Sequence, residues 1–379
     1  MKTSIVKIKQ AAVIMGLALT GIGSSGAITP ANALTFNFIS SNAIDPLALA
    51  GFQQAGARWS SLFNDNVTID LKIDYTALDP GILGQAGSSG QTYTYSQVYS
   101  ALNADKKSAD DTLAVNSLSN SSTFGRLINR TSDNPNGSGS AIPYVDPNHS
   151  SIYMNTANAK ALGLAVTPPT SGADAEISFS NLFTWDFNPN DGINANAYDF
   201  VGVATHEIGH ALGFVSGVDI LDGNSPPVNG PFFASQFTFV NTLDLFRYSS
   251  LSKASNVIDW TADARDKYFS LDRGATNIAL FSNGQNFGGD GRQASHWRDT
   301  MNLGIMDPTA GLGELLAIGD NDKRAFDAIG WDRIVANNNP TEVPEPENFV
   351  GTFIFAAFGA KMVLKRRQKL VESSEKEIV

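Results

Sequence analysis

Cysteine is absent from the 379 residues of this chain, and histidine occurs only four times. The absence of cysteine excludes disulfide scaffolds, thiolate nucleophiles and every metal or iron–sulfur site that depends on thiolate ligands. Charged residues make up only 17% of the chain, and its net charge is −11. A nucleic-acid-binding protein carries a basic surface, so we expect no nucleic-acid partner. Hydrophobic residues, at 42%, are numerous enough to form a buried core.

No apolar run reaches the roughly 20 residues that a membrane-spanning helix needs, but the N-terminus carries a shorter one. Residues 1–33 combine three lysines, the uncharged stretch Ala11–Ile22 and the small-residue site Ala31-Asn32-Ala33. This order is typical of a signal peptide, so the sequence predicts an exported protein that functions at the cell surface or outside the cell. The absence of cysteine agrees with export, because free thiols are reactive in oxidising surroundings.

The C-terminus carries a second pattern, in which Val343-Pro344-Glu345-Pro346 precedes the apolar segment 349–364 and a basic cluster that starts at Lys365. As a helix, the apolar segment reaches about 24 Å, short of a hydrocarbon core of about 30 Å. This order resembles the PEP-CTERM sorting signal of exported bacterial proteins. The resemblance implies a linker (336–348), a hydrophobic sorting helix (349–364) in contact with the membrane, and a basic-start cytoplasmic tail (365–379). Sorting machinery would then remove the tail; permanent anchoring stays open.

Between the two terminal signals, residues 34–335 are predicted to form one domain that mixes helices and strands. Asp45 and Pro46 are expected to start a helix in which Phe52, Ala55 and Trp59 recur at helical spacing. Further strands are expected at 34–39, 67–74, 151–155, 176–180, 242–248 and 267–272, and further helices at 95–103, 157–162 and from Asp320 to Ile329.

The stretch His206-Glu207-Ile208-Gly209-His210 is the strongest chemical signal in the chain. Residues at i and i+4 lie above one another on a helix face, so both imidazoles can reach one metal ion. Glu207 is beside them and can reach a water on that metal. Burying these polar groups in an otherwise apolar helix is unfavourable unless a metal compensates, so we expect a Zn²⁺ site.

Gly213 follows the second histidine by three residues and is predicted to end the helix with a positive φ. With it, the chain resembles the metzincin metalloproteases, whose signature continues to a third histidine that would fall at Ser216 here. A hydroxyl is a poor substitute for an imidazole on zinc.

The later sequence resembles the leishmanolysin-like metzincins, in which an insertion separates the glycine turn from the third histidine. In Ser295-His296-Trp297, His296 lies directly after an insertion at 217–295, and Met306 follows ten residues after His296. The resemblance implies that His206, His210 and His296 bind zinc, that Glu207 is the general base, and that Met306 forms an apolar floor beneath the metal.

The fold that this resemblance implies is α+β: a metzincin-like zincin domain with a mixed twisted sheet, an active-site helix and a C-terminal subdomain. The implied activity is hydrolysis of peptide bonds in a peptide or protein substrate, by water that zinc holds and Glu207 deprotonates. We expect an extended substrate to pair with the edge of the strand 176–180. His149 is expected to be exposed and not a ligand. Asp219 and Asp244 could support the ligands, although exposed or turn positions are favoured for both.

Two other interpretations of the sequence stay open. The replacement of the expected histidine by Ser216 suggests a surface or matrix binding protein that keeps the scaffold without activity. Retention of Glu207 speaks against it, because a structural zinc site needs no general base. The motif is also compatible with a zinc hydrolase whose substrate is not a protein.

Overall fold

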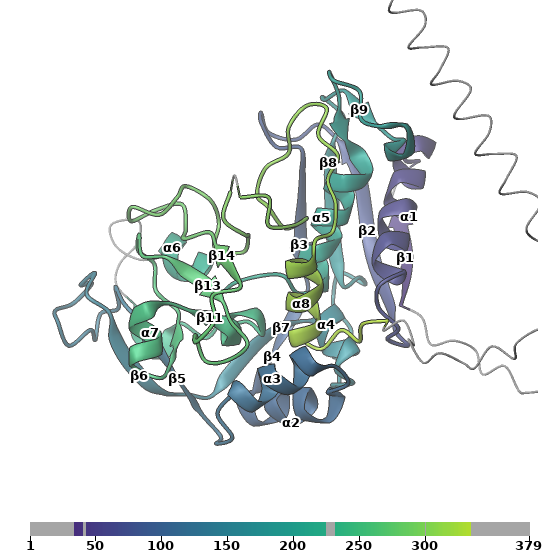
Figure 1. The fold of residues 1–379 in the computed structure, drawn as a ribbon. Coiled ribbons are helices and arrows are strands. Elements are labelled where there is room, and N and C mark those ends of the chain that lie inside the picture. Colours follow the sequence, from purple (N-terminus) through teal and green to yellow (C-terminus); the bar gives the residue numbers. More distant parts are fainter. Residues whose placement is uncertain (1–33, 41–42, 225–231, 300, 335–379) are drawn as a thin grey trace, which may run out of the picture. The chain divides into compact units, whose positions relative to one another are not determined.

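Residues 34–40, 43–224, 232–299 and 301–334 are described by the computed structural model, and they form helices, several small sheets and one four-stranded sheet (Figure 1). The expected α+β class is therefore confirmed. Within these ranges no helix is both long and apolar enough to cross a membrane. The predicted signal peptide (1–33), linker (336–348), sorting helix (349–364) and tail (365–379) lie outside the described residues.

The largest sheet has the strand order β1-β2-β8-β3. Strands β1 (Thr35–Ser40), β2 (Thr68–Thr76) and β8 (Ala175–Ser180) are parallel, and β3 (Gly84–Ser88) pairs antiparallel with β8. In β2 the side chains of Ile69, Leu71 and Ile73 are buried while their neighbours are partly exposed, as the alternating sequence predicts. Because β3 is last in the strand order, it forms one edge of this sheet, and β1 forms the other.

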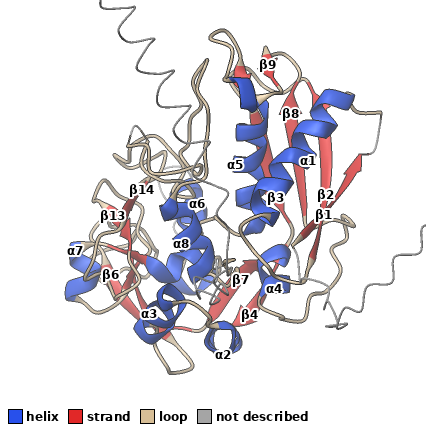
Figure 2. Ribbon diagram, turned by 45° about the vertical axis from the view of Figure 1, so that its right-hand side comes forward, coloured by secondary structure: helices blue, strands red, loops and turns tan. Residues whose placement is uncertain are grey.

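Two helices, α1 (Pro46–Ser60) and α5 (Phe200–Leu212), pack against each other and cover one face of this sheet (Figure 2). The carboxylate of Asp45 accepts the Leu47 N–H at 2.7 Å, which confirms the predicted start of α1. The Phe52 ring contacts Phe179 and Phe200 edge-to-face, with centroids 5.0 and 5.2 Å apart. This aromatic contact joins α1, the sheet and α5 into one core.

The other strands form small sheets: β4 (Gly90–Thr94) with β7 (Ser151–Asn155), β5 (Phe124–Ile128) between β6 (Tyr144–His149) and β12 (Ile258–Asp259), β13 (Lys267–Phe269) between β11 (Arg247–Tyr248) and β14 (Ala279–Phe281), and β9 (Trp185–Asp186) with β10 (Tyr198–Asp199). The other helices are α2 (Tyr95–Asp105), α3 (Ala109–Ser117), α4 (Thr156–Ala161), α6 (Val218–Asn224), α7 (Ser250–Ala254) and α8 (Asp320–Ala328). Short 3₁₀ turns occur at Pro189–Asp191, Ala234–Gln236 and Leu243–Phe246.

Helix α8 packs near the end of α5 and near α1. The ring of Phe326 lies 4.6 Å from Trp59, centroid to centroid. The indole of Trp331, just after α8, donates to the Leu212 carbonyl at 2.9 Å. These contacts hold the last turn of α5 in place.

Three local predictions need correction. The strand predicted at 242–248 is a 3₁₀ turn up to Phe246, because Asp244 accepts the N–H groups of Asn241 and Gly217 and so favours a turn. The strand predicted at 267–272 ends at Phe269, where Ser270 donates to Asp272 in a turn. Strand β8, the expected substrate-binding edge, is flanked on both sides by β2 and β3.

Candidate metal centre

The helix that carries His206 and His210 ends where its sequence predicts, and an aspartate caps its start. Asp199 caps the start of α5 by accepting the Gly202 N–H at 2.8 Å. Gly213 ends the helix at φ +119°, in the left-handed region that favours glycine. The chain then turns away, so the histidine face of α5 stays open to a segment from elsewhere in the chain.

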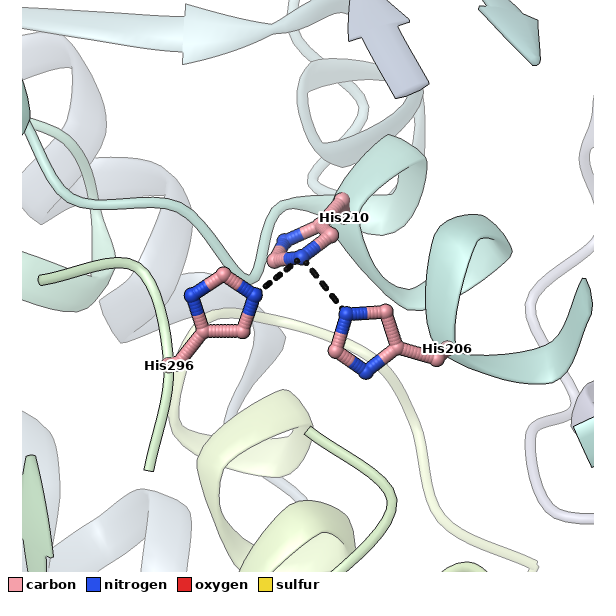
Figure 3. Close-up of side chains that lie close together, drawn as sticks. All are labelled: His206, His210 and His296. Atoms are coloured by element: carbon pink, nitrogen blue, oxygen red, sulfur yellow. Dashed lines mark hydrogen bonds between the residues drawn. The ribbon is translucent and has the colours of Figure 1, made fainter. Parts of the chain in front are cut away.

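His296 lies opposite this face of α5. It belongs to a later segment of the chain, and 85 residues separate it from His210. The Nε2 atom of His210 lies 3.1 Å from Nε2 of His206 and 3.1 Å from Nε2 of His296 (Figure 3). Two nitrogens bound to a tetrahedral zinc ion at the usual distance lie about 3.3 Å apart. The spacing of the three imidazoles therefore fits a single metal ion.

Hydrogen bonds on the far side of each ring fix the tautomer. The Nδ1 atoms of His206, His210 and His296 face the carbonyl oxygens of Ile305, Phe214 and Gln293 at 2.8, 2.7 and 3.3 Å. A carbonyl oxygen only accepts hydrogen bonds, so each Nδ1 carries the proton and each Nε2 presents a lone pair. Three lone pairs that point at one another repel, and a cation between them removes that repulsion.

The surroundings also keep the three rings neutral. Burial lowers the pKa of His206 to about 4, and burial together with the neighbouring His206 lowers the pKa of His210 to about 3. Burial, followed by the proximity of His210 and His206, holds the pKa of His296 well below its usual range. Neutral imidazole is the form that binds a metal, so this group could hold a metal ion at neutral pH.

Glu207 lies next to the histidine group and is not needed to complete it. Its side chain is buried, and burial raises the pKa of its carboxyl to about 8. It makes no hydrogen bond to the described residues, and it lines a cleft together with His206. A carboxyl that lines a cleft, without a protein partner, is free to exchange a proton with a bound molecule.

Met306 packs against α5 at Gly209 and is fully buried. A Cβ atom at Gly209 would lie 2.5 Å from the Met306 sulfur, so only glycine lets α5 approach the methionine this closely. The Trp297 N–H donates to the Met306 carbonyl at 3.0 Å, and this bond ties the segment of His296 to the turn that holds Met306. Met306 thus packs on the turn of α5 that lies between His206 and His210, and its role as an apolar floor beneath a metal stays a prediction.

Asp322 is a residue that the sequence analysis missed. Its carboxylate accepts the Trp297 indole N–H at 2.7 Å and the Ile305 N–H at 2.7 Å. It is fully buried at the start of α8, where burial raises its pKa to about 6. Asp322 therefore fixes two segments of the metal centre. One carries His296, and the other contains Ile305, whose carbonyl accepts a hydrogen bond from His206.

Ser216 and two acidic residues of the insertion, Asp219 and Asp244, support the segment that carries His296. The Ser216 N–H donates to the Ser295 hydroxyl at 2.8 Å, and the Ser216 hydroxyl donates to Asp244 at 2.6 Å. Asp219 accepts from the Ala294 N–H at 2.6 Å and from the Ser295 hydroxyl. Asp219 lies on α6 and Asp244 in the buried 3₁₀ turn Leu243–Phe246, and both are held in hydrogen-bond networks within the protein. The turn position expected for Asp244 is thus present, but neither carboxylate is exposed to solvent as a free surface acid.

His149 does not join the metal centre. It ends β6, is 8% exposed, and packs edge-to-face on Phe124 with ring centroids 5.3 Å apart. The expectation that it is exposed is wrong, because the β5–β6 pairing turns its ring into the core. Burial, with a smaller effect of Arg126, lowers its pKa to about 4.

Two clefts flank the histidines along β3. One, of about 390 Å³, is lined by residues 81–84, His206, Glu207 and residues 307–310. The other, of about 310 Å³, is lined by Ala86, Ser88, His210 and residues of the insertion. The Ser180 N–H donates to the Leu83 carbonyl, so alternation in the ladder turns the backbone groups of Gly84, Ala86 and Ser88 away from β8. An unpaired strand edge thus runs past the histidines.

Comparisons with protein-family models, with curated proteins and with solved structures give no match for this chain.

Proposed function

We propose that this protein is an exported zinc-dependent endopeptidase with a metzincin-like fold and a leishmanolysin-like third ligand, His296. The observation that carries this proposal is the convergence of three neutral Nε2 atoms beside the unpartnered carboxyl of Glu207. Zinc prefers such nitrogen donors, and three protein ligands leave one position open for water, as in catalytic zinc sites. Bound there, zinc would supply a Lewis acid and lower the pKa of water.

The proposed role of Glu207 follows from its position and its pKa. Burial makes the Glu207 carboxylate a stronger base than an ordinary glutamate, because it raises the pKa of the carboxyl. A cation bound to the histidines would favour the charged carboxylate, which is the form that accepts a proton. Glu207 accepts a proton from the attacking water and delivers it to the amine that leaves. Because Glu207 lines the cleft of residues 81–84, the leaving part of the substrate is assigned to that cleft.

An extended peptide is the substrate that the surroundings favour. The free edge of β3 offers alternating N–H and C=O groups at Gly84, Ala86 and Ser88, and these pair with another extended backbone. Both flanking clefts open onto this edge on either side of the histidines. This edge replaces the strand 176–180 as the proposed substrate-binding strand.

The non-catalytic alternative was motivated by Ser216. In the structure the Ser216 hydroxyl donates to Asp244, and His296 supplies a third imidazole instead. The loss of a histidine at 216 therefore has an explanation that keeps a three-histidine site, and this supports the enzyme over the binding protein.

Casein hydrolysis by the purified protein tests the proposal. The wild type is expected to carry about one zinc per chain, to lose activity with a chelator and to regain it when zinc is restored. Glu207→Gln is expected to keep zinc and to lose about 10²–10⁴-fold in rate. Glu176→Gln, which changes an exposed glutamate on β8, is the matched control and should leave the rate unchanged. Activity that survives in Glu207→Gln, or a protein that binds no zinc, would refute the proposal.

Export and sorting are proposed from the two terminal sequence patterns alone. Deleting residues 343–379 is expected to release a zinc-binding protein into the medium, because the residues that form the metal centre lie between His206 and Asp322. A truncated protein that stays with the cells would contradict the assignment of the C-terminal segment to sorting.

A further inference from the structure

A cleft of about 530 Å³ lies apart from the metal centre and shares no residue with the two clefts beside the histidines. It is formed by α2, the end of α3, the loop that leads into β5, and segments of the insertion around Tyr248, Val257 and Arg273. Helices α2 and α3 and strand β5 lie in the lower part of Figure 1. Its volume lies in the range of about 300–1,000 Å³ that is usual for small-molecule sites.

Aromatic rings form one wall of this cleft. The Tyr95 ring lies 4.8 Å from Phe124 and 6.2 Å from Tyr99, centroid to centroid. Tyr248 also lines the cleft, and only 4% of its surface is exposed to solvent. The hydroxyl of Tyr95 donates to the Ser119 carbonyl, whereas the hydroxyl of Tyr248 makes no hydrogen bond to any described residue. A buried hydroxyl that faces a cleft without a partner is available to a ligand.

Burial raises the pKa of Tyr248, so its hydroxyl stays protonated and can donate.

Arg273 supplies a fixed positive charge at the same place. Its guanidinium donates through Nε to the Ser117 carbonyl at 2.6 Å and through Nη2 to the Leu118 carbonyl at 3.2 Å. These bonds use two of the five guanidinium N–H groups, and the other three stay available.

The charge of the cleft differs from that of the whole chain. The protein has a net charge of −11, yet the residues that line this cleft include Arg273 and neither aspartate nor glutamate. Asp272, next in sequence to Arg273, is engaged by Ser270 and Thr276. An Arg guanidinium with free N–H groups binds a carboxylate well, because it can donate two parallel hydrogen bonds.

The rest of the lining is rich in short hydroxyl and amide side chains. The side-chain amides of Asn116, Asn120 and Asn256 make no hydrogen bond to the described residues, and Ser119 and Ser121 also line the cleft. A sugar ring has C–H groups on its faces and hydroxyl groups around its rim. Such a ring can pack on tyrosine while its hydroxyls bond to amides and hydroxyls.

We propose that this cleft binds a carboxylate-bearing sugar, that is, a uronic acid unit. Arg273 and the Tyr248 hydroxyl hold the carboxylate, the half-buried Tyr99 ring, which packs beside the fully buried Tyr95, carries the sugar face, and the asparagine amides bind its hydroxyls. The site does not depend on the proposed peptidase activity, since it shares no residue with the metal centre.

Calorimetry and ligand-detected NMR on the purified full-length protein test this proposal with glucuronate and galacturonate as probes. Galactose has the sugar ring without the carboxylate, and acetate has the carboxylate without the ring. At least one uronate is expected to bind more tightly than either control. Glu207→Gln is expected to bind the uronate like the wild type, because it changes the metal centre only.

Two variants address the assigned residues separately. Tyr248→Phe removes only a hydroxyl and is expected to weaken binding about 2–10-fold, and Arg273→Gln about 10–100-fold. Tyr144→Phe is the matched control, because its hydroxyl bonds to Thr131 outside the cleft. If neither uronate binds, if galactose or acetate binds equally well, or if Tyr248→Phe binds like the wild type, the proposal is overturned. Tyr248→Phe keeps the test decisive if Arg273→Gln does not fold.

Discussion

Replacing His296 by alanine is the change that tests the metal centre most directly. His296 is the one member of the histidine group that does not come from α5, and its removal leaves an i, i+4 pair. Its Nδ1 contact with the Gln293 carbonyl is the longest of the three, at 3.3 Å. The variant is therefore expected to lose little stability in the absence of metal and much of its affinity for zinc.

The size of the loss follows from the number of ligands. Four-ligand structural zinc sites bind with about 10–16 kcal/mol, which is about 2.5–4 kcal/mol per ligand. Loss of one ligand then weakens zinc binding by about 10²–10³-fold. At a free zinc concentration of 1,000 times the wild-type Kd, zinc raises the free energy of unfolding of the wild type by about 4 kcal/mol. For His296→Ala this increase is expected to fall to about 1 kcal/mol.

Thermal and denaturant unfolding with and without zinc, combined with titration against a competing chelator, measures this difference. His149→Ala is the matched control: it removes a buried histidine ring packed on Phe124, away from the metal centre. It is expected to lower the stability of the metal-free protein but to keep the full increase with zinc. Ser216→Ala should also keep it, since the Ser216 hydroxyl donates to Asp244. Wild-type zinc affinity in His296→Ala, or its loss in His149→Ala, would refute the assignment.

Three further predictions rest on other contacts of the site. Asp219→Asn weakens the hydrogen bonds that hold Ser295 beside His296, so zinc affinity should fall about 10–100-fold in the same chelator titration. An unchanged zinc affinity would exclude a supporting role for Asp219. Ala86→Pro removes an N–H that faces away from β8, so the KM for peptides should rise while zinc content stays constant, whereas Gln85→Pro should destabilise the sheet itself. The pKa of His149 is about 4 in the folded protein and about 6.5 when unfolded, so the unfolded state takes up a proton first as pH falls. Relative to His149→Gln, the wild type should therefore lose about 3 kcal/mol of unfolding free energy between pH 7 and pH 4, and parallel pH profiles would contradict this.

The sequence by itself determined features that depend on neighbouring residues. The cap at Asp45, the alternation in β2 and the glycine that ends α5 are local signals, and the structure contains all three. The juxtaposition of His206 and His210 has the same origin, because a helix places residues four apart on one face. Local geometry is fixed by a few dihedral angles, so the order of residues is enough to predict it.

Other features were decided only by the tertiary structure. The sequence pattern of 176–180 indicates a strand, but which side of β8 stays open depends on β3, which comes from residues almost a hundred positions earlier. Distant segments likewise determine the burial of His149 and the hydrogen-bond networks of Asp219 and Asp244. They also determine the hydrogen bonds by which Asp322 fixes the segment of His296. His296 was identified by resemblance, but the carbonyls that orient all three imidazoles became visible only in the fold. Hydrogen-bond partners far apart in sequence leave no periodic pattern, because each contact satisfies the geometry of the packed core and not that of its own segment.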